Sequence, residues 1–166
     1  MFRRLLILPA VLLLALPANA SASASREVDI VSFDGSFPTD EFCPFTLTEH
    51  QSGTFQIATF FNTAGDPTKS IITVRSHYAV SLSGNGRTLV GVSPFVQKDI
   101  LYPNGDVASR TLTGVVWQFR VPGGGLVLVD TGRVVRFHAD GPVVFEAGQH
   151  PVLDGNAQAL CDYFAS

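Results

Sequence analysis

The sequence predicts an all-β protein, an antiparallel meander that closes into a barrel of about 8–10 strands. Three observations support this fold class. Short apolar and β-branched runs recur along the chain, Gly, Pro, Asn and Asp separate them, and helical periodicity is almost absent after Ser25. A two-sheet β-sandwich built from the same strands is the alternative, and the barrel is preferred because hairpin connections dominate.

The strands can be placed in order from these runs and from the period of two along them. One face of the segment 71–82 carries Ile72, Val74 and Tyr78, and the other carries Arg75 and His77. The segments 111–121 and 133–138 alternate in the same way. Strands are therefore expected near residues 27–33, 43–50, 53–61, 70–82, 87–92, 97–102, 106–121, 125–130, 133–138 and 142–147, with a short helix near 156–163.

The connections have the residues that tight hairpins require. Gly84-Asn85-Gly86, Asn104-Gly105 and Asp140-Gly141 supply the positive φ of such turns. Pro122-Gly123-Gly124-Gly125 is a looser link between two long strands.

The N-terminus has the anatomy of a secretory signal peptide. A basic start with Arg3 and Arg4 precedes an apolar run over 5–16 and the small-x-small cleavage pattern Ala18-Asn19-Ala20. The apolar run is shorter than the roughly 18 residues of a spanning helix, so no integral membrane span is expected after cleavage. The sequence thus predicts a secreted protein with a signal peptide over 1–20, a flexible segment over 21–26 and a single all-β domain over 27–166.

The charge of the expected mature chain is acidic. Removal of Arg3 and Arg4 leaves nine basic residues against 14 acidic ones, a net charge of −5. The only lysines left are Lys69 and Lys98, and no basic cluster stands in the sequence. Nucleic-acid binding and attraction to an anionic membrane are therefore not predicted.

Two cysteines, Cys43 and Cys161, lie near the two ends of the mature chain. A secreted chain meets an oxidising environment, so one intramolecular disulfide is the expected state. A nucleophilic thiol would need a nearby base and a lowered pKa, and the sequence around neither cysteine supplies them.

Several separated motifs stand out along the chain. They are Cys43-Pro44-Phe45, Gly53-Thr54-Phe55, Tyr78, Asn104-Gly105-Asp106, Pro122-Gly123-Gly124-Gly125, Asp130-Thr131-Gly132-Arg133, Ala147-Gly148-Gln149-His150 and Cys161-Asp162-Tyr163. Together they resemble a group of small, uncharacterised secreted proteins of actinobacteria and related bacteria. The resemblance implies secretion, the Cys43–Cys161 pairing and an all-β fold, and it transfers no activity.

The tripeptide Asp130-Thr131-Gly132 is also found in the catalytic loops of aspartic proteases. Those enzymes bring two such loops together so that two carboxylates share a proton. This chain has one copy, and Arg133 beside it would favour the ionised carboxylate. The tripeptide is therefore interpreted as a tight turn between two apolar strands.

The histidines do not have the local spacing of a zinc site. Arg75-x-His77 and Arg136-x-His138 each place an Arg and a His on one strand face. If the two strands are neighbours, the four side chains form an anion-binding surface; the alternative is an ordinary solvated face. Glu146 and His150 lie close in sequence, but Ala147-Gly148 between them indicates a turn rather than an acid–base pair.

Function is predicted only in outline. The 13 phenylalanines, Trp117 and three tyrosines exceed what a small sandwich core needs. Core packing is their expected use, and a barrel interior that is not completely filled would let some of them line an apolar pocket. The preferred hypothesis is a non-enzymatic module that binds a small or lipophilic ligand, or a surface partner. The alternative is a hydrolase or isomerase that uses His and Asp/Glu at the barrel mouth. No catalytic residue, metal or cofactor is assigned, and no oligomeric state is predicted.

Overall fold

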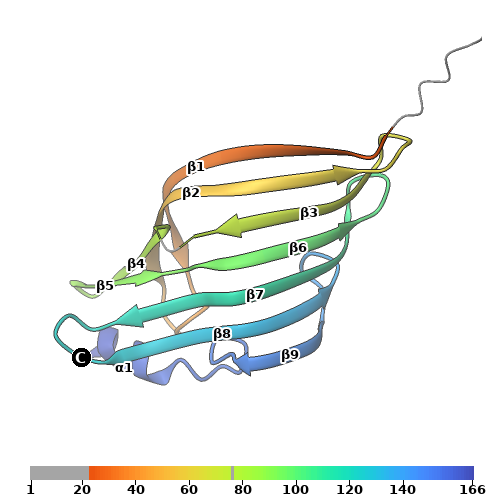
Figure 1. The fold of residues 1–166 in the computed structure, drawn as a ribbon. Helices are drawn as coiled ribbons and strands as arrows, with labels where there is room; N and C mark the ends of the chain where they lie inside the picture. Colours follow the sequence, from red (N-terminus) through yellow and green to blue (C-terminus); the bar gives the residue numbers. More distant parts are fainter. Residues whose placement is uncertain (1–22, 76) are drawn as a thin grey trace, which may run out of the picture.

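The protein folds as one curved antiparallel sheet with a short helix near one end (Figure 1). The structure is a computed structural model and describes residues 23–75 and 77–166. The predicted signal peptide over 1–20 lies outside the described residues. The strands are β1 (Ser25–Thr39), β2 (Leu47–Phe61), β3 (Pro67–Val74), β4 (Ala79–Gly84), β5 (Arg87–Val92), β6 (Phe95–Leu101), β7 (Val107–Arg120), β8 (Leu126–Phe137) and β9 (Val143–Gln149), and the helix is α1 (Gln158–Ala165).

The strands follow one another as an up-and-down meander with one interruption. β1 pairs with β2 over its whole length, so β3 and β4 share the other edge of β2. In the same way β6 and β5 share one edge of β7, and β8 pairs along the opposite edge. The segment from β3 to β6 is thus one long hairpin. β3 and β4 form one arm, β5 and β6 form the other, and each arm is interrupted between its two strands.

The predicted all-β antiparallel meander is confirmed, but its closure differs from the predicted barrel. A ring of hydrogen-bonded neighbours runs through six strands, in the order β2, β3, β6, β7, β5 and β4. β1, β8 and β9 lie outside this ring. The described strands therefore form neither an even barrel of about 8–10 strands nor a two-sheet sandwich.

A row of three glycines bends the sheet. Gly114 of β7, Gly132 of β8 and Gly148 of β9 lie opposite one another and have φ values of 121°, 142° and 124°. A side chain would not fit there, because a Cβ on Gly132 would clash with the carbonyl oxygen of Ala147. We call these three residues the glycine row. Gly53, with φ of 143°, continues the bend where β2 changes partner from β4 to β3.

The core lies on one side of this bend, where α1 and the segment 40–46 cover one face of the sheet. We call this the inner face and the opposite face the outer face. Strand side chains such as Leu82, Leu89 and Phe119 pack there against Leu160 and Phe164 of α1. β1 and β9, by contrast, contain no buried residue.

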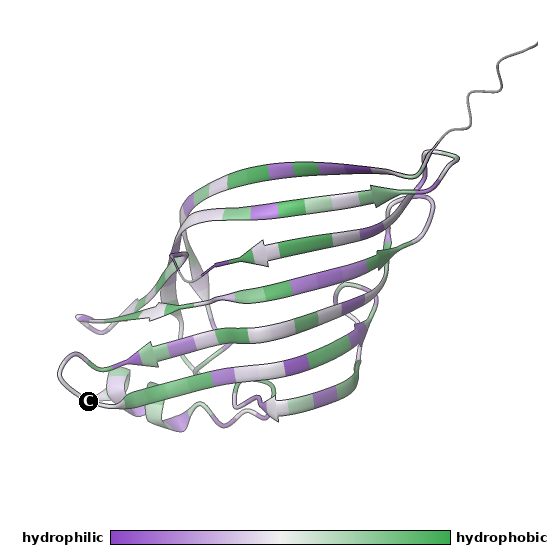
Figure 2. Cartoon of the chain, in the orientation of Figure 1, coloured by the Kyte–Doolittle hydropathy of each residue, from purple (hydrophilic) through white to green (hydrophobic). Residues whose placement is uncertain are grey.

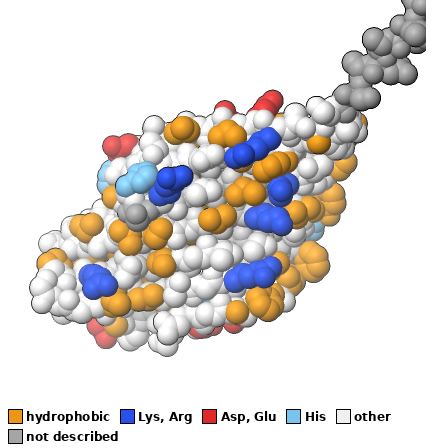
Figure 3. All heavy atoms as spheres, in the orientation of Figure 1, with side chains coloured by type: hydrophobic (Ala, Val, Ile, Leu, Met, Phe, Trp, Pro, Cys, Tyr) orange, Lys and Arg blue, Asp and Glu red, His pale blue; other side chains and the backbone are white. Residues whose placement is uncertain are grey.

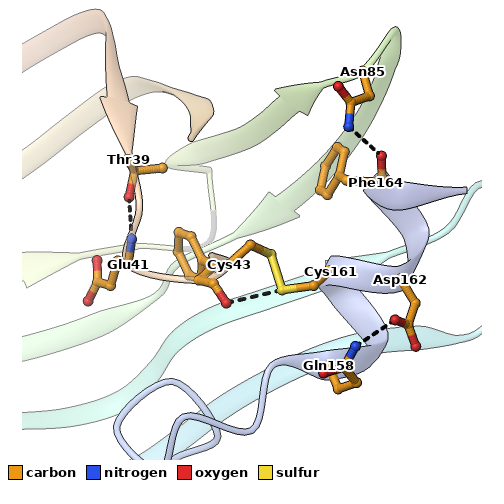
Figure 4. The surroundings of a disulfide bond; sticks show 9 residues. Thr39, Glu41, Cys43, Asn85, Gln158, Cys161, Asp162 and Phe164 are labelled. Atoms are coloured by element: carbon orange, nitrogen blue, oxygen red, sulfur yellow. Dashed lines mark hydrogen bonds between the residues drawn. A yellow bond between two sulfur atoms is a disulfide. The ribbon is translucent and has the colours of Figure 1, made fainter. Parts of the chain in front are cut away.

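A disulfide holds α1 against the sheet. Cys43 and Cys161 are bonded with a Cα–Cα distance of 5.5 Å, which confirms the predicted pairing (Figure 4). Asn85 at the β4–β5 turn donates a hydrogen bond to the carbonyl oxygen of Phe164, and Arg87 donates to that of Tyr163. The bond spans 118 residues, and the chain-entropy model gives about 4–5 kcal/mol for a loop of that length.

Several predicted strand boundaries are corrected by the structure. Residues 47–50 and 53–61 join as β2, because Gly53 bends the strand without ending it, and residues 43–46 of the predicted strand lie before β2. The segment 70–82 divides into β3 and β4. β1 begins at Ser25, so the last two residues of the N-terminal segment predicted over 21–26 lie in a strand. The predicted turns at Asn85-Gly86 and Asn104-Gly105 are confirmed, with positive φ at Asn85, Gly86 and Gly105.

The turn predicted at Asp130-Thr131-Gly132 is wrong. These residues lie inside β8, which runs unbroken from Leu126 to Phe137. The glycine is needed for the close approach of β9 rather than for a change of chain direction.

Because the glycine row has no room for a side chain, a larger residue there should destabilise the protein. Gly132→Ala would place a Cβ against the backbone of β9 in a positive-φ conformation, so we expect the free energy of unfolding to fall by at least about 2 kcal/mol. Chemical denaturation measures it. Gly125→Ala is the control, because no atom lies within 4 Å of its added Cβ. Equal effects of the two substitutions would contradict a structural role for the glycine row.

Candidate functional site

A cavity of about 360 Å³ opens on the inner face, next to the bend. Residues of β2, β3, β6 and β7 alternate along their strands, so that every second side chain points into it. We call it the inner cavity. Its lining residues are Gln51, Phe55, Ile72, Val74, Tyr78, Ser93, Phe95, Gln97, Leu112, Val116 and Trp117.

Aromatic contacts fix the shape of the inner cavity. Phe55 and Tyr78 meet edge to face with ring centroids 6.2 Å apart, and Phe42 meets Trp117 in the same way at 5.5 Å. Gly53 permits the first contact, because a Cβ there would lie 3.0 Å from the Cα of Tyr78. The bend and the cavity therefore depend on the same backbone conformation.

A chain of polar groups forms one end of the inner cavity. The hydroxyl of Tyr78 donates a hydrogen bond of 2.8 Å to Oε1 of Gln51, and the Gln51 amide donates to the carboxyl of Glu49. Glu49 is only 2% exposed. Its burial raises the pKa of Glu49; the hydrogen bond from Gln51 opposes this, and the negative charge of Glu41 adds to it. Burial, and then the charge of Glu49, also raise the pKa of Tyr78.

A smaller hollow of about 80 Å³ lies beyond Trp117 and shares the wall of Leu112 and Val116 with the inner cavity. Glu41, Asp130 and Arg136 provide its polar lining. The pKa of Glu41 is raised, first by desolvation of its carboxyl and then by the charge of Asp130, while Arg136 opposes the shift.

Behind this hollow, Asp130 and His150 form a buried pair. The Nδ1 atom of His150 lies 3.0 Å from Oδ1 of Asp130, and the two residues are 4% and 3% exposed. The Nε2 atom of His150 faces the carbonyl oxygen of Ala147 at 3.3 Å. Both ring nitrogens thus face acceptors, which is the arrangement of a protonated imidazolium.

The surroundings of His150 favour its charged form. Burial alone would lower the pKa of His150. The hydrogen bonds to Asp130 and to the Ala147 carbonyl, and the negative charges of Asp130 and Glu146, outweigh burial and raise that pKa above its ordinary value. Because neither nitrogen is left to face a substrate, the pair is suited to joining β8 to the C-terminal segment rather than to acid–base catalysis.

A second ion pair, between a buried carboxylate and a partly exposed guanidinium, lies on the inner face at the far end of β6 and β7. Arg110 contacts Asp99 through both carboxylate oxygens, with Nε–Oδ1 and Nη2–Oδ2 distances of 3.0 and 3.1 Å. Gln97, which lines the inner cavity, donates to the same carboxylate at 2.8 Å. This bidentate pair holds the Gln97 amide in one orientation.

The structure does not bring together the four residues of the anion-binding hypothesis. Arg75 and His77 line an outer-face hollow of about 280 Å³, where Nε2 of His77 lies 3.2 Å from the hydroxyl of Thr54. β6 and β7 separate that strand edge from β8, which carries Arg136 on the inner face. His138 follows β8, and its Nδ1 lies 3.2 Å from the carbonyl oxygen of Val107.

Sequence reasoning missed Glu49 and the Asp130–His150 pair. Glu49 shares its strand face with Leu47 and Phe55, and Asp130 shares one with Leu128 and Val134, so period-two alternation was the available signal. Residues 23–75 and 77–166 contain no group of three His, Cys, Asp or Glu side chains that could hold a metal ion.

Comparison with known proteins adds no relative. No protein-family model, no curated protein and no solved structure matches the chain. The resemblance to small secreted actinobacterial proteins therefore stays a prediction. In the described part of the chain, no helix has the length and apolarity to cross a membrane.

The burial of Glu49 predicts a stabilising substitution. A raised pKa means that the folded state loses stability as pH rises from the unfolded pKa through the folded one. Glu49→Gln removes this cost while its amide oxygen still accepts the hydrogen bond from Gln51. We expect a higher denaturation midpoint than wild type at pH 7, and little difference at pH 4. A lower midpoint at pH 7 would show that a charged Glu49 stabilises the fold.

Substitution of His150 is expected to destabilise the protein, whereas Glu49→Gln is expected to stabilise it. A raised His pKa gives stability that is fully present below the unfolded pKa and is lost as pH rises through the folded pKa. His150→Gln should therefore cost about 3 kcal/mol at pH 6, where it leaves Asp130 unpaired. The difference from wild type should shrink toward pH 9, as followed by urea denaturation across the pH range. A difference that does not change with pH would mean that His150 is neutral in the folded protein.

Proposed function

We propose that the protein is a secreted binding module that holds a small, mainly apolar ligand in the inner cavity. The observation that carries this proposal is the cavity itself, which is lined by Phe55, Ile72, Phe95 and Trp117 and remains open beside a filled core. Secretion is supported by the buried disulfide, which forms in oxidising compartments.

The size and chemistry of the inner cavity suit this role. Its volume of about 360 Å³ falls within the roughly 300–1,000 Å³ of small-molecule sites. Its polar groups are few and lie among apolar ones: the amides of Gln51 and Gln97 and the hydroxyls of Tyr78 and Ser93. Such groups orient a neutral polar end of a ligand by hydrogen bonding.

The alternative, a hydrolase or isomerase, has less support. The only buried Asp–His contact among the described residues is the Asp130–His150 pair, and the free nitrogen that a general base needs is turned to the Ala147 carbonyl. Glu41 and Arg136 line the hollow in front of this pair, but the hollow measures only about 80 Å³.

Trp117 provides a direct test, because it is the only tryptophan of the chain and lines the inner cavity. We expect the neutral apolar probe N-phenyl-1-naphthylamine to bind saturably and to quench Trp117 fluorescence by energy transfer. Ile72→Phe narrows the cavity and should weaken binding by about tenfold, the effect of roughly 1.4 kcal/mol. Dissociation constants from fluorescence titration measure the change.

The control is Ile71→Phe, which adds the same volume to the outer face of the same strand. It should bind the probe as wild type does. Failure of wild type to bind the probe, or equal weakening by both substitutions, would exclude the inner cavity as the binding site for a neutral apolar ligand.

A further inference from the structure

The outer face gathers most of the positive charge of the protein. Of the nine basic residues after the predicted cleavage site, six lie on this face, although they are scattered along the sequence (Figure 3). The pairing registers place them there: Arg26 and Lys69 both lie opposite Phe60, and Lys98 lies opposite Ile71. We call this set the basic face. It consists of Arg26, Lys69, Arg75, Lys98, Arg120 and Arg133.

The acidic residues of the strands have the opposite distribution. The strands contain seven acids, and the registers place six of them on the inner face: Glu27, Asp29, Glu49, Asp99, Asp130 and Glu146. Asp34 is the only strand acid on the outer face, and it lies 3.8 Å from His50. A chain whose predicted mature form has a net charge of −5 therefore presents a cationic sheet surface.

Exposed apolar side chains fill the spaces between these cations (Figure 3). Ile30 is 78% exposed and Phe137 is 56% exposed, and Val28, Val96, Ile100 and Phe145 are also exposed on this face. Lys69 and Arg26 lie over the ring of Phe60, at 4.0 and 5.5 Å, and Arg133 lies 5.6 Å from the ring of Phe145. The cations and apolar groups thus form one mixed surface rather than separate patches.

We infer that the basic face docks on an anionic lipid surface. Apolar side chains of this kind insert between lipid head groups while Lys and Arg pair with the phosphates. The hollow of about 280 Å³ lined by Arg75, His77 and Thr54 opens on the same face and has the polar lining that suits a phosphate head group.

Other occupants match the basic face less well. A second copy docked through the same face would bring two sets of six cations together. Single-stranded nucleic acid needs aromatic rings free for base stacking. The ring of Phe60 is covered by two cations, and four of the six exposed apolar residues named above are aliphatic. The inference goes beyond the proposed ligand site, since the inner cavity opens on the other side of the sheet.

The test is co-sedimentation of the purified protein with vesicles of 30% phosphatidylglycerol in phosphatidylcholine. We expect binding at 50 mM NaCl, loss of binding at 500 mM NaCl and no binding to pure phosphatidylcholine. Arg133→Gln should weaken partitioning by about fivefold, the effect of one cation at a charged membrane. Its control is Arg136→Gln, which removes the same charge from the inner face of the same strand.

A second matched pair tests the apolar contribution. Ile30→Asn and Phe33→Asn both change exposed residues of β1, but only Ile30 is on the outer face. Ile30→Asn should weaken partitioning and Phe33→Asn should not; because all variants share one N-terminus, these differences report on the sheet. Absence of binding to anionic vesicles, or equal losses within each pair, overturns the inference. Binding to a DNA oligonucleotide that Ile30→Asn leaves unchanged would overturn it in favour of a nucleic-acid surface.

Discussion

The bend at the glycine row is the constraint on which the other features of the molecule depend. Gly132 and Gly148 bring the backbones of β8 and β9 so close that neither position can hold a Cβ, and Gly114 extends the contact to β7, where a Cβ would lie 2.8 Å from the Pro94 carbonyl. The sheet on one side of the row curves over α1 and encloses a core, while the other side stays uncovered. The inner cavity lies where the two meet: Phe95 is paired with Gly114, and Tyr78 packs on Gly53. A flat sheet of the same sequence would have no such cavity.

The covered half carries two costs that its other contacts offset. Glu49 is buried with no ion-pair partner among the described residues, and Asp130 is buried with His150 as its ion-pair partner. Each would favour opening of the sheet if nothing else held it closed. The disulfide, and the hydrogen bonds from Asn85 and Arg87 to the end of α1, fix the C-terminal segment over these groups. His150 lies between β9 and α1, so the segment that carries the helix over the core also brings the imidazole to Asp130.

The local elements could be predicted from the sequence, but the contacts between residues distant in sequence could not. The fold class, most strands, two hairpin turns and the Cys43–Cys161 bond could be predicted, because they depend on alternation, turn residues and cysteine number, which are local properties. Figure 2 shows the alternation as bands of differing hydropathy along the strands. Asp130-Thr131-Gly132 was misread because a glycine with positive φ is needed both in a turn and at a close strand contact, and one sequence cannot distinguish them. The Asp130–His150 pair joins residues 20 apart through the β8–β9 register, which local patterns do not specify. Arg75 and Arg136 were grouped on the assumption of neighbouring strands, and strand order is likewise non-local.

The positive charge of the outer face is the clearest example of a feature that depends on strand register and was therefore not predicted from the sequence. An excess of 14 acidic over 11 basic residues and the absence of a basic cluster argue against an anionic partner only if positive and negative charges are mixed on the folded surface. Here the alternation of side chains along the strands separates the charges by sign. Lys69, Lys98 and Arg133 fall on the outer face, while Asp99 and Glu146 fall on the inner face. Such a molecule has a preferred orientation near a negatively charged lipid surface: the outer face is attracted and the acidic inner face is repelled. The mouth of the inner cavity would then face away from the lipid. If the protein binds a ligand and a lipid surface as proposed, ligand exchange through water would continue on the docked protein, and the two binding events would not compete.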